Sequence, residues 1–207
     1  MRRQQLTQLI GALVVAAALV GLPATAFAVI TGSAHDLSAQ SYTTEICNVC
    51  HTPHNASTVT AAPLWDHTET SATYTVYSST TLNASPGQPS GVSKLCLSCH
   101  DGTVAIDAFA GATGTTSVTG AALVGTALAN DHPISFTYNT ALATADGELF
   151  DPSTDTTSLG GTIAEDLLFS DSLECASCHD VHNALGNANL LQIANTDSDL
   201  CLTCHDK

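Results

Sequence analysis

Basic residues are almost missing from this chain. Only 4 of its 207 residues are Lys or Arg, against 19 Asp and Glu, and the formal net charge is −15. Arg2 and Arg3 stand at the very start, so only Lys94 and Lys207 remain beyond residue 28. With two lysines the chain has no basic patch to neutralise phosphates, which argues against nucleic-acid binding. An acidic surface suits cationic partners, metal ions or mineral surfaces, or simply solvation in an exported protein.

Aromatic residues and methionine are also scarce. Phe, Trp and Tyr together make up 5 % of the chain, and the only methionine is Met1. The length suits one domain. Because Ser, Thr, Ala and Gly dominate, we expect no ordinary side-chain core, and some other apolar group has to supply much of the buried surface.

Cysteine is used in a single pattern. All 8 cysteines fall in four copies of C-x-x-C-H, at 47–51, 96–100, 175–179 and 201–205. This motif is typical of c-type haem attachment, in which both thiols form thioethers and the histidine binds iron. We therefore predict four haem c groups. The thioethers are assigned to Cys47, Cys50, Cys96, Cys99, Cys175, Cys178, Cys201 and Cys204, and the proximal iron ligands to His51, His100, His179 and His205.

Two other uses of paired cysteines have to be weighed. Tetrahedral zinc sites also use C-x-x-C pairs, and exported chains use disulfide frameworks. Neither needs a histidine directly after every second cysteine. Haem attachment explains all four histidines and is the preferred interpretation.

The first 28 residues have the pattern of a signal peptide. Arg2 and Arg3 form a positive start, 9–22 is mostly apolar, and 26–28 reads Ala-Phe-Ala, a cleavage pattern. The apolar run is short for a membrane span, although an uncleaved anchor is the alternative. Haem is attached to such motifs outside the cytoplasm, so we expect an exported protein, extracellular or at the cell surface, with the periplasm as the alternative.

The mature chain contains an internal repeat. C-x-x-C-H-x-x-H-N-A occurs at 47–56 and 175–184, and L-C-L-[S/T]-C-H-D occurs at 95–101 and 200–206. We therefore divide 29–207 into two dihaem modules, about 29–110 and 126–207, joined by a Gly/Thr/Ala linker. Short strands are predicted at 73–77 and 134–138, a helix N-cap at Ser93 and a capping box at 171–174.

Five further histidines compete for the second axial position of four irons. Methionine is excluded as a ligand because Met1 lies in the signal peptide. The repeat matches His35 with His132 and His54 with His182, so these four are the predicted distal ligands. His67 has no counterpart, and we expect it behind a ligand or at the surface rather than on iron. All-histidine ligation predicts low potentials, since a Met/His pair raises them.

These motifs resemble the multihaem cytochromes c with doubled C-x-x-C-H motifs. More closely, 32–36, 50–55, 62–65, 95–102, 131–133 and 175–183 are similar to extracellular tetrahaem filament cytochromes of the OmcE type. The resemblance implies a loop-rich fold with short helices at the motifs and a few strands, wrapped around a continuous haem stack. It also implies a homopolymer in which a histidine of one subunit binds a haem of the next. We expect His54 to be that histidine, reaching the haem at 201–205 of a neighbour.

The function expected from these features is electron transfer without catalysis. The filament would receive electrons from donor cytochromes and pass them to extracellular acceptors. The alternatives are a soluble periplasmic shuttle or complex subunit, or a haem reductase with one open iron. Small soluble tetrahaem shuttles are usually Lys-rich with a basic docking face, and this acidic chain departs from that pattern.

Overall fold

The computed structural model describes residues 29–207. The predicted signal peptide, 1–28, lies outside the described residues. Within 29–207, no helix combines the length and the apolar character needed to cross a bilayer.

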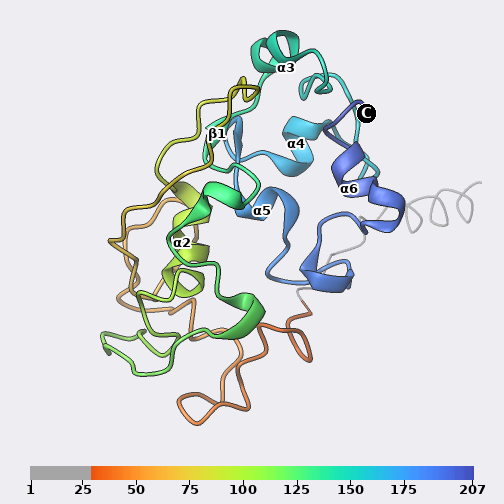
Figure 1. The fold of residues 1–207 in the computed structure, drawn as a ribbon. Helices are drawn as coiled ribbons and strands as arrows, with labels where there is room; N and C mark the ends of the chain where they lie inside the picture. Colours follow the sequence, from red (N-terminus) through yellow and green to blue (C-terminus); the bar gives the residue numbers. More distant parts are fainter. Residues whose placement is uncertain (1–28) are drawn as a thin grey trace, which may run out of the picture.

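Loops make up most of the described chain, and its helices and strands are short (Figure 1). The helices are α2 (Gly91–His100), α3 (Thr140–Asp146), α4 (Ile163–Leu167), α5 (Cys175–Cys178) and α6 (Asp199–Leu202). Shorter 3-10 turns are η1 (Gly120–Ala122), η2 (Leu128–Asn130), η3 (Ala188–Leu190) and η4 (Thr196–Ser198). The two strands, β1 (Phe136–Thr137) and β2 (Ser172–Leu173), pair antiparallel with Phe136 opposite Leu173. The loop-rich fold expected from the sequence is confirmed.

Helices begin or end at three of the four C-x-x-C-H motifs. α2 ends at His100, α5 holds both cysteines of the third motif, and α6 contains Cys201. The first motif forms a single turn, closed by the hydrogen bond from the His51 N–H to the Cys47 carbonyl at 2.9 Å. A helical turn is what the spacing needs, because residues three apart lie on one face and both thiols then point to the same side.

Among residues 29–207, α2 is the longest helix, and it ends for a local reason. Ser90, in extended conformation, precedes it, and its residues Leu95 and Leu97 are buried. Gly102 follows with a φ of +75°, and a Cβ there would lie 2.7 Å from the side chain of Leu123. Only glycine fits this turn, which lets the 120–125 segment approach the second motif.

The side-chain core is small. One cluster of buried residues contains Phe136, Tyr138, Ala143, Ile163 and Leu173, and a second contains Tyr74, Leu97 and Leu128. Several large apolar side chains are exposed instead, among them Leu64, Leu123, Leu185 and Leu202. This balance agrees with the expectation that much of the buried surface has to come from another group.

The predictions of individual strands and helix caps were confirmed only in part. The strand predicted at 134–138 contains β1, whereas 73–77 contributes only an isolated bridge from Thr75 to Ala127. Both cap predictions were wrong. Ser93 lies inside α2 and is fully buried, and α5 begins at Cys175 with Glu174, rather than Asp171, as the flanking residue. Ser93 instead donates a hydrogen bond to Glu174, which is itself the N-cap residue of α5.

Candidate haem sites

Three of the four histidines predicted as proximal ligands are oriented by a backbone carbonyl. The Nδ1 atoms of His51, His100 and His179 lie 2.7, 2.7 and 3.1 Å from the carbonyl oxygens of Pro63, Ala122 and Asn189. A carbonyl can only accept, so Nδ1 carries the proton and Nε2 keeps its lone pair. This arrangement is common for histidines that bind metal, because it fixes both the tautomer and the ring direction.

The carbonyls come from loops that repeat between the two halves of the chain. His51 forms a bridge with Trp65, and His179 forms the same bridge with Leu191. Matching backbone hydrogen bonds surround both: Thr52 N–H to Leu64 carbonyl (2.9 Å), Asp180 N–H to Leu190 carbonyl (2.6 Å), Asp66 N–H to Cys50 carbonyl (2.9 Å) and Gln192 N–H to Cys178 carbonyl (2.9 Å). Sequence reasoning missed these carbonyls. The signal was there in the shared Ala-x-Leu of 62–64 and 188–190.

The second and fourth motifs are held differently. The predicted linker 111–125 is part of the second site, since the N–H groups of Val124 and Gly125 both donate to the carbonyl of His100, at 2.8 and 3.2 Å. His205 instead bridges to Leu149, a residue that precedes the motif in the chain. His51, His179 and His205 are thus held by loops from their own half, and His100 by the linker between the halves.

Three pairs of histidine rings lie at a similar distance from each other, one pair nearly parallel and two edge to face. Ring centroids are 6.0 Å apart for His35 and His100, and 6.3 Å apart for His51 and His182 and for His132 and His205. Two imidazoles on opposite faces of one iron would be about 6.3 Å apart. This follows from a metal–nitrogen bond of about 2.1 Å and a ring nitrogen about 1.1 Å from its centroid, given ring bonds near 1.3 Å. The residues therefore fit three bis-histidine haems.

Two of the predicted ligands remain without such a partner. Within residues 29–207, no ring faces His179 at this spacing, and none faces His54. The expectation that His54 completes the haem at 201–205 does not agree with the geometry, because His132 already faces His205. The position left open belongs to the third motif.

Two of the paired histidines are shifted toward their neutral form. Burial, and then the neighbouring His100, His179 and His182, lower the pKa of His35. Burial and then His132 lower the pKa of His205, outweighing the nearby Asp146. Neutral imidazole is the form that binds iron, so both shifts favour ligation.

His67 is buried, not exposed, and its two ring nitrogens are already engaged. Nδ1 lies 2.9 Å from the Thr68 carbonyl and Nε2 lies 3.0 Å from the Ala105 carbonyl, while the Cys99 sulfur is 3.4 Å from Nε2. Its side chain also packs against Trp65, which in turn packs against His51. His67 therefore lies between the first two motifs, behind the ligands.

The thiols of successive motifs are neighbours. Burial and then Cys50 raise the pKa of Cys99 to about 12, and burial and then Cys178 raise that of Cys204 to about 12. Between the second and third motifs, a hydrogen bond to Cys175 and burial raise the pKa of Cys96. The attachment points therefore follow one another in the order of the sequence.

A buried carboxylate follows the second motif. The Asp101 side chain accepts hydrogen bonds from Tyr74 Oη (2.5 Å), Thr70 Oγ1 (2.7 Å) and the backbone N–H and Oγ1 of Thr103 (2.7 and 2.8 Å). Burial raises the pKa of Asp101, but these hydrogen bonds outweigh it and the net shift is downward. The network ties the 70–74 segment to the end of α2 and so holds His100 in place.

Buried polar atoms without a partner support the presence of a further group. In the described part of the chain these are His35 Nδ1 and Trp65 Nε1, and both residues pack against proximal histidines. The exposed Leu64 and Leu123 directly follow Pro63 and Ala122, whose carbonyls accept the histidine hydrogen bonds. Leucines exposed beside an iron ligand are what a macrocycle would cover. The residues present fit haem, which would supply one-electron redox chemistry at its iron.

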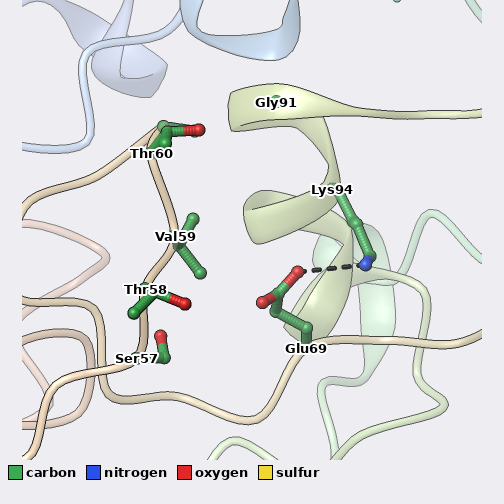
Figure 2. Close-up of a pocket in the computed structure, with 8 residues that line it drawn as sticks. Ser57, Thr58, Val59, Thr60, Glu69, Gly91 and Lys94 are labelled. Carbon is green, nitrogen blue, oxygen red and sulfur yellow. Dashed lines mark ion pairs between the residues drawn. The ribbon is translucent and has the colours of Figure 1, made fainter.

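A solvent-open cleft lies away from these ligands. It has a volume of about 340 Å³ and runs between 57–61 and the start of α2 (Figure 2). Its cation, Lys94, is paired with Glu69 at 3.0 Å, as Figure 2 shows. Because the charge of Lys94 is neutralised by Glu69, we assign no ligand to this cleft.

Comparison with known proteins agrees with the motif chemistry. A family model described as the doubled CXXCH motif matches residues 169–207, which contain the third and fourth motifs. No curated protein matches the chain. The match supports a multihaem c-type cytochrome, and hence haem binding and electron transfer.

Proposed function

We propose that this chain is an exported tetrahaem cytochrome c that conducts electrons as the subunit of a filament. The observation that carries the proposal is the spacing of the three histidine pairs, each at the distance that one iron requires. Iron held by two histidines would leave no site for a substrate at these three haems, which favours electron transfer over catalysis. Eight thiols and four proximal histidines give the chain four haem c groups.

The order of the motifs supports a continuous row of haems. Cys50 neighbours Cys99, Cys96 neighbours Cys175, and Cys178 neighbours Cys204. Haems attached at these points lie next to one another from the first motif to the fourth. Such a row gives electrons a path along the molecule.

The internal repeat supports one way in which subunits would join into a filament. His182 lies three residues after His179, the histidine of the third motif. Its ring is paired with His51, the histidine of the first motif, so it reaches from the third haem site back to the first. His54 lies three residues after His51, as His182 lies three residues after His179. Two haems before the first haem of one copy comes the third haem of the preceding copy, and this third haem is the expected target of His54. That haem, held by His179, is the one without a distal histidine in its own chain. His54 of one subunit therefore binds the iron at His179 of its neighbour, and the row of haems continues across the joint.

Assembly of a His54 variant tests this proposal. The holoprotein carrying His54→Ala should keep four haems and stay dispersed, while the wild type forms filaments. The matched control is His67→Ala, which removes a histidine whose ring is engaged inside the subunit and should leave assembly intact. Filaments of unchanged length from His54→Ala would refute the joint.

A second function is favoured by the same open position. In a dispersed subunit His179 would be the one histidine of the chain available to the third haem, which would then be able to bind a substrate, as a haem reductase does. In a soluble shuttle or complex subunit, a group from outside this chain would instead supply the second ligand of the haem at His179. High-spin haem in the wild-type protein as it is isolated from cells would favour the reductase. Fully low-spin filaments would favour conduction.

A further inference from the structure

Glu174 occupies a position that is apolar in the other motifs. The residue directly before the first cysteine is Ile46, Leu95 or Leu200 in the first, second and fourth motifs, and Glu174 in the third. Its side chain is only 3 % exposed. A buried carboxylate is costly unless hydrogen bonds compensate for lost hydration, so packing alone does not explain it.

Hydroxyl donors surround this carboxylate. Oε2 of Glu174 accepts a hydrogen bond from Ser93 Oγ and another from Ser135 Oγ at 2.8 Å. Ser93 in turn accepts from the backbone N–H of Cys175 at 2.9 Å, and the Glu174 N–H donates to Ser177 Oγ at 2.9 Å. Two donors on one oxygen are the arrangement that suits a negatively charged group.

No lysine neutralises this charge. Within residues 29–207 both lysines are paired elsewhere, Lys94 with Glu69 and Lys207 with Glu148. Glu174 is therefore a buried carboxylate held by neutral donors only. In such surroundings its field is weakly screened and reaches further than that of a surface carboxylate.

The carboxylate lies where the two halves of the molecule meet. Ser93 belongs to α2, which carries the second motif, and Glu174 directly precedes α5, which carries the third. These helices pack side by side near the centre of the molecule (Figure 1), and the thiol of Cys96 is a neighbour of the thiol of Cys175. Glu174 thus sits at the junction between the second and third haem sites.

We propose that Glu174 is a buried anion that lowers the reduction potentials of the haems at the second and third motifs. Oxidised haem carries one more positive charge than reduced haem, so a nearby anion stabilises the oxidised form. A unit charge roughly 10 Å away, at an effective dielectric constant of about 20, changes such an equilibrium about tenfold. The inference rests on haem attachment but not on filament assembly.

Glu174→Gln removes the charge and keeps the size and the accepting oxygen. In potentiometric titration of the holoprotein, fitted as four one-electron steps, two steps should rise by about 59 mV, the equivalent of a tenfold change. The other two should stay in place. The matched control is Glu45→Gln, since Glu45 is exposed and lies two residues before Cys47. It should move no step measurably, because water screens that charge.

Haem content is measured first, on every variant. A wild-type chain without haem would overturn the proposed function itself. With haem present, equal titrations for Glu174→Gln and wild type, or an equal shift of all four steps, would overturn the role of Glu174. If Glu174→Gln fails to load haem, Glu174→Leu decides, because it removes the charge and supplies the apolar residue type found at this position in the other three motifs. A rise confined to two steps supports the inference, and no rise refutes it.

Discussion

Removal of His182 tests the assignment of ligands across the molecule. Its ring faces His51 at 6.3 Å, although the two residues belong to opposite halves of the chain. In the His182→Ala holoprotein, the first haem should lose its sixth ligand while the other three keep theirs. One quarter of the haem should therefore change from low-spin to high-spin, in addition to any high-spin fraction in the wild type. The side chain of His182 is half-exposed, so its loss leaves no cavity in the core.

The assay is electron paramagnetic resonance of the oxidised holoprotein, calibrated against total haem. His67→Ala is the control, because His67 is buried but engages two carbonyls rather than an open ligand position. That variant should lose stability and gain no high-spin haem. An unchanged spectrum for His182→Ala, or a quarter of high-spin haem for His67→Ala, would refute the assignment.

Three further variants probe what holds the haem sites in place. Tyr74→Phe removes one donor from the buried Asp101 carboxylate and should lower the free energy of unfolding by about 1–3 kcal/mol, read from denaturant midpoints. Ile163→Ala empties the centre of the larger core cluster and should cost about 2–5 kcal/mol without any change in the haem spectrum. Lys94→Ala breaks an exposed ion pair with Glu69 and should cost less than about 1 kcal/mol, so a larger loss would contradict its peripheral place.

The sequence predicted the residue types of the haem sites better than it predicted which distal histidine pairs with which motif. The four motifs and the repeat carry direct signals, since thioether spacing and the adjacent histidine are local. The repeat left His67 without a counterpart, and in the structure its ring nitrogens lie near the carbonyls of Thr68 and Ala105. Which distal histidine faces which motif depends on how distant segments pack. The crossing of His182 to His51 therefore could not be read from spacing, and neither could the pairing of His132 with His205.

The groups that support the ligands were harder to predict. The carbonyls of Pro63, Ala122 and Asn189 are backbone atoms, so almost any residue could supply them. Ser93 and Glu174 look like residues of helix caps in sequence, and only the packing of α2 against α5 turns them into partners. Local patterns describe single turns, whereas these interactions join turns far apart in the chain.

Electron cryomicroscopy of the holoprotein sheared from cells tests the central claim most directly. The account predicts filaments with a repeat of four haems. In the density, His54 of one subunit should bind the iron held by His179 of the next, and His35, His182 and His132 should bind within their own subunit. Discrete monomers with four six-coordinate haems, or filaments in which His54 points into solvent, would contradict it.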